Sequence, residues 1–470
     1  MTYYSQYNQD RFLNEHIFKN KKEGVFIDIG AYDGVEGSNS YFFEKELGWK
    51  GICFEPLPKL YQRLKENRNC VSINAAAWKE DTEKTFRLID GYSEMLSGIV
   101  DCYDPRHINR IEQESREQNQ KIIDVPVKCL DINKILEQYG IYHIDFLSID
   151  VEGSEFEILK HLNTDIFEID YIVCENNYND TTIVEMMKSK GYNRITRLNI
   201  DDVYVRDLST RQNKFKIVIP SYNNSDWVET NIESILCQTY KNYEVLYIND
   251  ASTDDTLTKV NNLVGNNPQW KTVSNEKNMR RGYNISPYNE DLIKFMTSDS
   301  DILTFVDGDD WLAYPNSLES LNSYYNLYNP WLTYGKFVCY TTLKEGNPQN
   351  TPYPDVVHAY NSYRQDHWRA SHLRTFKWWL YKKIKKEDLL YSKTNQYYFH
   401  AEDLASTYPC LEICPVNKIG IVPTVNYVFN DTPSNRARGV KREADAGVDL
   451  ELEIRQKVPY PKINLNTNKL

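Results

Sequence analysis

The sequence lacks a long apolar run, a leader-like N-terminus and paired cysteines. No stretch of ~18 consecutive apolar residues occurs, so no membrane-spanning helix is predicted. Residues 1–10, MTYYSQYNQD, are polar and do not predict a signal peptide. The nine cysteines are scattered and form no CxxC pair, which disfavours a structural metal site. We therefore expect a cytoplasmic location, or the host cytoplasm if the protein is viral.

Positive charge is also in deficit. The chain has 55 Lys and Arg against 67 Asp and Glu, which gives a formal net charge of −12. Because nucleic-acid binders usually carry a basic surface, nucleic acid is not a predicted partner. A hydrophobic content of 41% with 36 Tyr allows packed cores and excludes a disordered chain. The length of 470 residues predicts two or three domains.

Apolar, β-rich runs alternate with amphipathic segments in the N-terminal part of the chain. This alternation predicts a parallel sheet with helices on both faces. Two closely spaced runs, 193–198 and 202–206, predict a hairpin at the end of that sheet. The predicted strands are 24–30, 51–55, 71–76, 144–150 and 169–175, and the predicted helices include 58–67 and 153–161.

A polar segment without periodicity separates this alternation from a second one. The second series has strands at 216–220 and 244–249 and helices at 227–238 and 253–263. A new strand–helix–strand series after a completed sheet indicates a second domain. We predict an α/β protein with a first domain at 1–207, a linker at 208–214, a second domain at 215–442 and a polar tail at 443–470.

A glycine-rich turn follows the first predicted strand. The segment DIGAYDG, residues 28–34, lets the backbone approach a nucleoside ligand closely. Glu55 ends the next strand, where an acid can accept both ribose hydroxyls. The pattern GxGxxG is absent and an acid precedes the first glycine, which disfavours pyrophosphate recognition. A cationic sulfonium cofactor without phosphate tolerates such acids.

This region resembles the FkbM-type S-adenosylmethionine-dependent methyltransferases. The resemblance spans roughly residues 5–206 and rests on SQYNQDRFL, FIDIGAYDGVEGSNS, GWKGICFEPLP and FLSIDVEGSEFEIL. It implies a class I methyltransferase fold with a Rossmann-like sheet and O-methylation of a sugar hydroxyl. Many relatives have Lys where this chain has Ser148, so no role of that Lys is carried over. The implied cofactor-binding residues are Asp28, Gly30, Asp33, Gly34, Asn39, Glu55 and Asn74.

O-methylation needs a group that takes or orients the hydroxyl proton. Asp150 and Glu152 follow the strand 144–150, and Glu175 ends the next strand. Any of the three carboxylates can face the acceptor. The alternative is that Asp150 and Glu152 only cap the following helix, where acids are stabilising.

An acidic turn marks the second domain. Asp307 and Asp309 lie in VDGDD, residues 306–310, directly after a predicted strand. A nucleotide-sugar carries a diphosphate, and a carboxylate-bound divalent metal neutralises its charge as the bond breaks. Acids at this spacing can place one carboxylate on the ribose and one on the metal. A solvated acidic turn is the alternative, since Asp-Gly is a turn pair.

PSYNN, INDASTDDT and VDGDD resemble the family 2 glycosyltransferases of the GT-A fold. The resemblance covers about residues 215–432 and is strongest at its start. It implies inversion at the anomeric carbon, Mn²⁺ or Mg²⁺ on Asp309, and Asp403 of the pair 402–403 as the base. Arg280 or Arg281 can offset diphosphate charge, although a surface position is an equal alternative. The implied residues of the donor pocket are Pro220, Tyr222, Asn223, Asp250 and Asp307.

Together these motifs predict a bifunctional enzyme that builds and decorates a glycan. Its predicted ligands are S-adenosylmethionine, a divalent metal, a nucleotide-diphospho-sugar donor and a sugar or glycan acceptor. One alternative keeps a single domain active and makes the other a glycan-binding or scaffold module. A second alternative makes both domains non-catalytic. It predicts missing acids at Glu55, Asp309 or Asp403, and all three are present.

Overall fold

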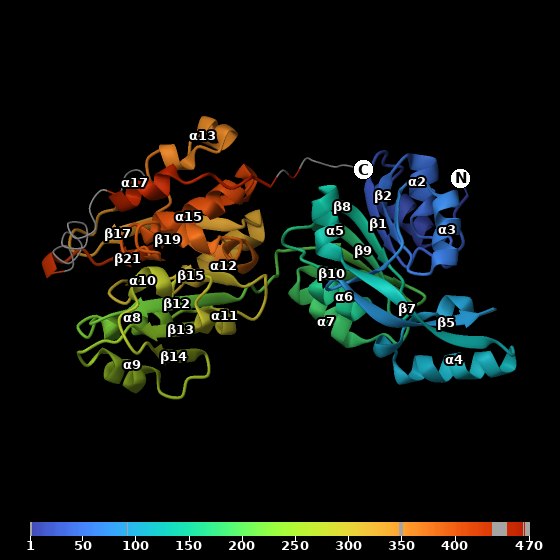
Figure 1. The fold of residues 1–470 in the computed structure, drawn as a ribbon, viewed down its shortest axis with the longest axis horizontal. Coiled ribbons are helices and arrows are strands. Elements are labelled where there is room, and N and C mark those ends of the chain that lie inside the picture. The colour runs from blue at the N-terminus through green and yellow to red at the C-terminus, as the bar shows by residue number, and fades with distance from the viewer. Residues whose placement is uncertain (1, 92, 347–350, 435–448, 464, 466–470) are drawn as a thin grey trace. The chain divides into compact units, whose positions relative to one another are not determined.

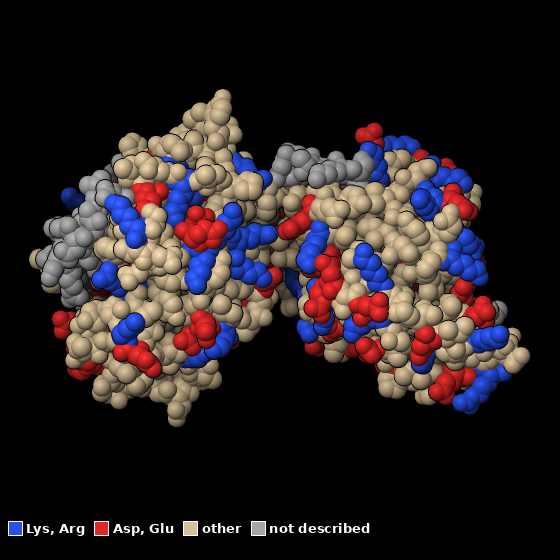
Figure 2. Space-filling view, in the orientation of Figure 1, with Lys and Arg blue, Asp and Glu red and all other residues tan. Residues whose placement is uncertain are grey.

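The computed structural model describes residues 2–91, 93–346, 351–434, 449–463 and 465. The described residues divide into two compact units, 2–211 with Leu465 and 212–463, and each has a main sheet of its own (Figure 1). Within the described ranges, no helix is long and apolar enough to cross a membrane. On the face drawn in Figure 2, Lys and Arg lie among Asp and Glu on both units.

The first unit is built on a seven-stranded sheet of order β10-β11-β9-β8-β1-β2-β3. The strands from β9 to β3 are parallel, and the antiparallel pair β10–β11 extends the sheet beyond β9. This pairing confirms the predicted parallel sheet and its terminal hairpin. The strands are β1 Val25–Ile29, β2 Lys50–Phe54, β3 Val71–Ile73, β8 His143–Ile149, β9 Glu168–Glu175, β10 Tyr192–Leu198 and β11 Asp201–Arg206.

Helices pack against this sheet through apolar residues one turn apart. The helix α3 begins with Pro58 in its first turn, where proline is tolerated, and buries Leu60 and Leu64. Asp131 and Asp180 cap α5 and α7 by accepting hydrogen bonds from backbone N–H groups. The helices are α1 Gln9–Phe12, a π-helix at Leu13–Phe18, α2 Tyr41–Leu47, α3 Pro58–Asn67, α5 Ile132–Tyr139, α6 Glu155–His161 and α7 Thr181–Ser189.

A second, four-stranded sheet in the first unit was not predicted. Its order is β4-β7-β5-β6, and it is accompanied by the helix α4. The predicted strand 71–76 is therefore wrong as one element, because a turn closed by Ala75 N–H and the Ile73 carbonyl directs the chain into the new sheet. The elements are β4 Ala76–Trp78, β5 Thr82–Asp90, β6 Gly98–Ile99, β7 Lys121–Asp131 and α4 Pro105–Glu117, with short 3₁₀ turns at Glu94–Leu96 and Val100–Cys102.

The second unit has an eight-stranded sheet of order β14-β13-β12-β15-β18-β17-β21-β16. The strands β14, β13, β12 and β15 are parallel, and β18 continues the sheet antiparallel to β15. A separate ribbon pairs β19 with β20. The strands are β12 Phe215–Ser221, β13 Tyr243–Asn249, β14 Trp270–Ser274, β15 Ile302–Phe305, β16 Trp311–Leu312, β17 Leu332–Cys339, β18 Thr375–Lys377, β19 Leu390–Tyr391, β20 Gln396–Tyr397 and β21 Ile419–Phe429.

The helices of the second unit include one from the predicted tail. Arg364 donates to the Ile454 carbonyl of α17 at 2.7 Å and forms a buried ion pair with Glu412 of α15. Residues 435–448, which include the predicted domain end at 442, lie outside the described residues. The helices are α8 Val228–Leu236, α9 Thr256–Val264, α10 Arg280–Asn284, α11 Glu290–Phe295, α12 Ser317–Tyr328, α13 Asp355–Tyr360, α14 Trp378–Tyr381, α15 Glu402–Ile413 and α17 Asp449–Gln456, with 3₁₀ turns at Tyr363–Gln365, Lys386–Leu389 and Val416–Lys418.

Candidate active sites

The first unit contains a cavity of about 370 Å³ at the carboxyl edge of its parallel strands. Gly30, Glu55, Asp150 and Glu175 line it, and each ends or directly follows a strand of the main sheet. The carboxyl ends of parallel strands meet at one edge of a sheet, which is where ligands of such folds bind. The sequence therefore brings these four residues together as predicted.

Backbone crowding explains the first glycine of the motif. Gly30 has a φ of 86°, in the left-handed region that side chains disfavour. A Cβ atom at this position would lie 1.8 Å from the carbonyl oxygen of Asp150. Only glycine therefore lets β1 and β8 approach each other at the rim of the cavity.

Glu55 is held at the cavity wall by backbone donors. Its carboxylate accepts hydrogen bonds from the N–H groups of Tyr32 at 3.2 Å and Leu57 at 2.8 Å. The side chain is buried, and this burial raises the pKa of Glu55 to about 8. Each carboxylate oxygen has more than one lone pair, so the group can accept further hydrogen bonds from a ligand.

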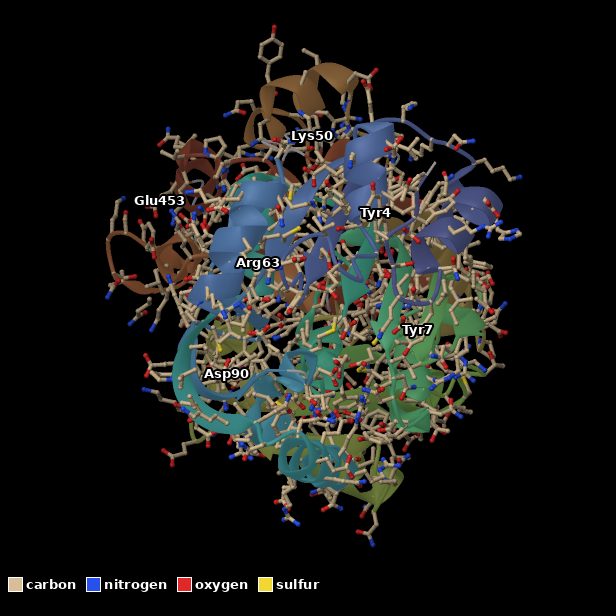
Figure 3. The ribbon with its side chains drawn as sticks, turned by 90° about the vertical axis from the view of Figure 1, so that its right-hand side faces the viewer. Tyr4, Tyr7, Lys50, Arg63, Asp90 and Glu453 are labelled. Atoms are coloured by element: carbon tan, nitrogen blue, oxygen red, sulfur yellow. The ribbon has the colours of Figure 1, made fainter. Side chains whose placement is uncertain are left out.

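Two acids of the glycine-rich turn, Asp28 and Asp33, form hydrogen bonds and an ion pair that hold the turn in place. Asp28 accepts hydrogen bonds from the hydroxyls of Ser38 and Ser40, and burial raises its pKa. Asp33 accepts hydrogen bonds from backbone N–H groups of its own turn and forms an ion pair with Arg63 of α3 at 2.6 Å. Arg63 and Tyr7, which lines the cavity, are labelled in Figure 3. In the described part of the chain, neither acid is part of the cavity wall.

The remaining residues of the implied cofactor set also lie outside the described cavity wall. Gly34 packs closely against α3, since a Cβ atom there would lie 2.7 Å from the Leu64 side chain. Asn39 donates to the Ser148 hydroxyl at 3.0 Å. Asn74 donates to the Glu55 carbonyl at 2.9 Å. These contacts position the wall, and direct cofactor contact by these residues stays a prediction.

Asp150, Glu152 and Glu175 form a cluster, and we call it the acid triad. Ligand oxygens of all three lie within 4.8 Å of one another. Asp150 and Glu152 do not cap the helix α6, because Ser154 occupies its N-cap and no side-chain capping hydrogen bond forms there. Desolvation inside the cavity, followed by the neighbouring carboxylates of Asp201 and Glu155, raises the pKa of Asp150 to about 8. Burial and then the neighbouring carboxylates also raise the pKa of Glu175.

The unpredicted sheet, its 3₁₀ turn Glu94–Leu96 and the helix α4 also line the cavity. Their contribution includes the charged residues Glu94, Arg110 and Glu114. Among the described lining residues, six are acidic and Arg110 is the one Lys or Arg. No sequence signal marked these residues, since they come from a region without a recognised motif. The lining therefore carries more acidic than basic side chains.

The second unit has a cavity of about 460 Å³ at the carboxyl edge of β12, β13 and β15. Asn223 is not part of the described cavity wall. It shapes the adjoining turn, where its side-chain oxygen accepts a hydrogen bond from the Thr253 N–H at 2.7 Å. Six of the predicted residues line this cavity: Pro220, Tyr222, Asp250, Arg281, Asp307 and Asp309.

Asp250 organises the start of α10. Its carboxylate accepts hydrogen bonds from the Asn275 side chain at 2.7 Å and from the backbone N–H groups of Met279 at 2.7 Å and Arg280 at 2.8 Å. This contact fixes the turn that carries Arg280 and Arg281 to the cavity wall. Of the two positions that the sequence left open for Arg281, the structure shows the one at the cavity wall.

Arg281 bridges three carboxylates. Its Nε lies 2.7 Å from Asp307, and its Nη1 contacts both Asp403 and Glu402 of α15. Asp403 also pairs with Arg374 at 2.9 Å. Burial would raise the pKa of Asp403, but the two guanidinium groups outweigh it and hold this pKa well below its usual range.

The acidic turn at 307–310 has a fixed shape. A Cβ atom on Gly308 would lie 2.4 Å from the Ser221 hydroxyl, so glycine is required there. Asp310 is buried and accepts hydrogen bonds from the Tyr427 hydroxyl and the Asn430 N–H, both at 2.7 Å. The turn is thus anchored through Asp310, while Asp307 and Asp309 face the cavity.

Several lining residues of the second cavity were not predicted. Glu402 lines the cavity, whereas its neighbour Asp403, the predicted base, does not belong to the described wall. The acid pair in the sequence was a signal for both residues, but it could not show which of them faces the cavity. The other unpredicted lining residues are Ser221, Asn224, Asn278, Asn284 and Phe399, whereas Arg280 was a candidate beside Arg281.

Comparison with known proteins finds similar sequences and similar solved structures. The chain is 26% identical to the hyaluronan synthase of Pasteurella multocida over 181 residues, and 43% identical to the chondroitin synthase of P. multocida strain Pm70 over 58 residues. These matches cover 35% and 12% of this chain, and they span only 19% and 6% of the two relatives. The solved structure of TarS residues 1–349 from S. aureus matches 46% of this chain and 60% of its own, with 17% identity and a TM-score of 0.36.

Family profiles match the two units separately. The methyltransferase FkbM domain matches residues 28–194, which contain the glycine-rich turn, Glu55 and the acid triad. The glycosyl transferase family 2 profile matches residues 216–390, which contain Arg281 and the acidic turn. The chain therefore carries an FkbM methyltransferase domain followed by a family 2 glycosyltransferase domain.

Proposed function

We propose that the chain is a bifunctional enzyme that acts on sugars. One half would transfer a methyl group from S-adenosylmethionine to a sugar hydroxyl. The other would transfer a sugar from a nucleotide-diphospho-sugar with inversion. One observation carries the proposal: each parallel sheet bears its own cavity at its carboxyl edge, and the charges lining each cavity match the ligand of its family.

The first cavity fits S-adenosylmethionine. The cofactor supplies an electrophilic methyl group on a cationic sulfur and carries no phosphate. Six acidic lining residues against one Arg favour such a cation and disfavour a dinucleotide. Glu55 would hold the ribose hydroxyls with its free lone pairs, and Gly30 would allow close approach of the backbone.

A carboxylate of the acid triad would receive or orient the acceptor proton. The general base of a reaction near neutral pH works best with a pKa close to that pH. The pKa of about 8 places Asp150 in that range, and its side chain is exposed in the cavity. Glu152 and Glu175 would stand beside it.

The second cavity fits the donor of a family 2 glycosyltransferase. Pro220, Tyr222 and Asp250, with the turn formed by Asn223, would hold the nucleoside, and Asp307 would approach the ribose. Arg281 would face the diphosphate. The arrangement combines an arginine for the phosphates with carboxylates for a cation.

Asp309 would bind Mn²⁺ or Mg²⁺, both of which prefer oxygen ligands. Bound there, the metal would neutralise charge on the leaving diphosphate. Within the described residues, Asp309 belongs to no group of three close carboxylate, imidazole or thiolate ligands. The metal site would therefore be complete only with the donor's phosphates.

Asp403 would take the proton of the acceptor hydroxyl. In the structure its two oxygens contact Arg281 and Arg374. A diphosphate in the cavity competes for Arg281, which would release one oxygen of Asp403 when the donor binds. This coupling would keep the base inactive until the donor is present.

The acceptor would be a sugar or glycan. The names of the two Pasteurella relatives, hyaluronan synthase and chondroitin synthase, support a saccharide acceptor for the second domain. The fusion supports a common glycan as the target of both domains.

Calorimetry on the full chain tests this proposal. We expect binding of S-adenosylmethionine and, in the presence of Mn²⁺, binding of one or more members of a nucleotide-diphospho-sugar panel. Binding of only one ligand class would assign activity to one domain alone. Binding of neither would leave a scaffold and contradict the proposal.

A further inference from the structure

The acid triad has a geometry beyond what a proton acceptor requires. Three carboxylates from two strand ends place oxygens within 4.8 Å of one another, at a cavity wall. Ionised carboxylates this close repel one another strongly, and a cation bound between them removes this repulsion. The neighbouring Asn177 also lines the cavity, and its amide donates weakly to Glu152 at 3.4 Å. The nearby cation Arg110 pairs with Glu114 at 2.8 Å.

Glu175 supplies a second, independent observation. Its side chain is only 4% exposed and extends toward the other two carboxylates. Within the described ranges, no hydrogen bond or ion pair satisfies the Glu175 carboxylate. The Glu175 oxygens are not among the fully enclosed, unsatisfied polar atoms of the described residues, so they are open to the cavity, where a cation can reach them. Carboxylates at buried positions are commonly paired or coordinate metals.

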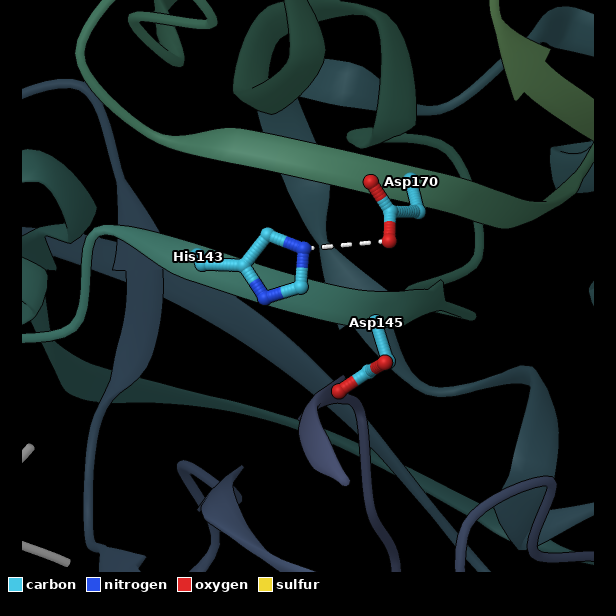
Figure 4. Close-up of side chains that lie close together, drawn as sticks. All are labelled: His143, Asp145 and Asp170. Carbon is cyan, nitrogen blue, oxygen red and sulfur yellow. Dashed lines mark hydrogen bonds and ion pairs between the residues drawn. The ribbon is translucent and has the colours of Figure 1, made fainter. Parts of the chain in front are cut away.

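A second cluster in the same sheet shows what satisfied acids look like. His143, Asp145 and Asp170 also place ligand atoms within 4.8 Å, at the amino ends of β8 and β9 (Figure 4). There, His143 contacts Asp170 at 3.0 Å, and Asp145 accepts hydrogen bonds from Lys21 and the Val25 N–H. Protein donors already bind the acids of that cluster, whereas none of the described residues donates to the Glu175 carboxylate.

We propose that Asp150, Glu152 and Glu175 bind a divalent cation, Mg²⁺ or Mn²⁺, in the methyltransferase domain. Both ions prefer carboxylate oxygens and keep some positions for water or substrate. The site would be distinct from the one proposed at Asp309, because it lies in the other unit and has three protein ligands of its own.

The proposed cation also indicates the class of acceptor. This step rests on the methyl transfer proposed above. A cation with open positions at the cavity wall would chelate two neighbouring hydroxyls, so the acceptor would be a sugar with a vicinal diol. In the transfer, the sulfur keeps the electron pair of the C–S bond, the acceptor oxygen forms the new C–O bond, and the hydroxyl proton passes to a triad carboxylate oxygen that does not hold the cation. The cation favours this proton loss by stabilising the negative oxygen.

Titration with Mn²⁺, followed by the loss of the free-ion electron paramagnetic resonance signal, tests the site directly. The protein is the full chain carrying Asp309→Ala, without nucleotide, so that the second domain does not contribute. We expect one bound Mn²⁺ per chain. Glu175→Gln and Asp150→Asn should each weaken binding at least about tenfold. Asp170→Asn, in the cluster of Figure 4, is the matched control and should leave the affinity unchanged.

The variants separate loss of the metal from loss of the fold. Asp150 is exposed, so Asp150→Asn should leave the folded domain intact even if Glu175→Gln does not. S-adenosylmethionine binding measured on the same samples should persist in both variants, and its absence in all samples would refute the methyltransferase proposal without affecting the metal result. No Mn²⁺ binding up to millimolar concentration, or equal affinity in Asp150→Asn, would overturn the metal site.

Discussion

Replacing Arg281 by Met should destabilise the second domain and weaken donor binding. Arg281 is the common ion-pair partner of Asp307, Glu402 and Asp403. Its removal takes away the cation that these three neighbouring carboxylates share. Breaking a buried ion pair costs about 3–5 kcal/mol. The side chains of Arg281, Asp307 and Asp403 are 16%, 24% and 28% exposed, so solvent screening reduces the expected loss to about 2 kcal/mol.

The pH dependence of this loss follows from Asp403. Its pKa is lowered in the folded protein, so the ion pair contributes its full stability above the ordinary aspartate value of 3.8 and loses it as the pH falls through the lower folded value. The difference between wild type and Arg281→Met should therefore be constant from pH 5 to pH 8. It should shrink only below about pH 4.

Urea unfolding of the full chain measures the effect. With a slope of about 2 kcal/mol per molar, a loss of about 2 kcal/mol lowers the midpoint of the second domain's transition by about 1 M. The matched control is Arg280→Met, because Arg280 is exposed and its guanidinium stacks over Phe399 at 4.6 Å. An unchanged midpoint in Arg281→Met, or an equal shift in the control, would refute this reasoning.

Three further predictions concern single contacts. The pKa of Glu55 is about 8, so this group is mostly protonated at pH 7. Ribose hydroxyls that donate hydrogen bonds to Glu55 favour its ionised form, so S-adenosylmethionine binding at pH 7 should release a proton from it. Calorimetry in buffers of different ionisation enthalpy measures this proton release, which should be absent in Glu55→Gln. Asp403→Asn should bind donor but lose sugar transfer, whereas Glu402→Gln should keep transfer within about tenfold; single-turnover assays giving the reverse order would make Glu402 the base. A fragment of residues 1–211 should be more stable than 1–207 by about 3 kcal/mol in urea, because Arg211 forms a buried ion pair with Asp165 at 2.6 Å; equal midpoints would show that the pair contributes nothing.

The sequence was most informative where strands run into motifs. Glu55, Asp150, Asp307 and Asp309 follow apolar strands, and parallel pairing then brings their side chains to one edge. Strand order along the chain and local composition were sufficient for this prediction. Both cavities consequently contain most of the acids that the motifs indicated.

The sheet β4-β7-β5-β6 could not be predicted in the same way. The strands β5 and β7 pair along residues 82–90 and 121–129, and both keep many residues at least partly exposed. Such strands lack a continuous apolar run, and their partner lies far away in the sequence. The wall that this sheet and α4 add to the first cavity was therefore missed.

Long-range ion pairs were equally hidden. Arg281 and Asp403 are 122 positions apart, and no local pattern links them. The sequence could identify both residues as functional candidates, but only the fold shows that they contact each other. The same holds for Glu175, because only the fold shows that its carboxylate has no hydrogen-bond or ion-pair partner among the described residues.

Two activities in one chain with independent sites are the central claim, and paired variants test it most directly. The full chain carrying Glu55→Ala or Asp309→Ala is assayed for S-adenosylmethionine binding and for Mn²⁺-dependent turnover of the nucleotide-sugar donor. Glu55→Ala should weaken cofactor binding by about 1–3 kcal/mol and leave donor turnover unchanged. Asp309→Ala should abolish donor turnover and leave cofactor binding unchanged. Loss of both activities in either variant, or donor turnover that persists in Asp309→Ala or in EDTA, would contradict the account.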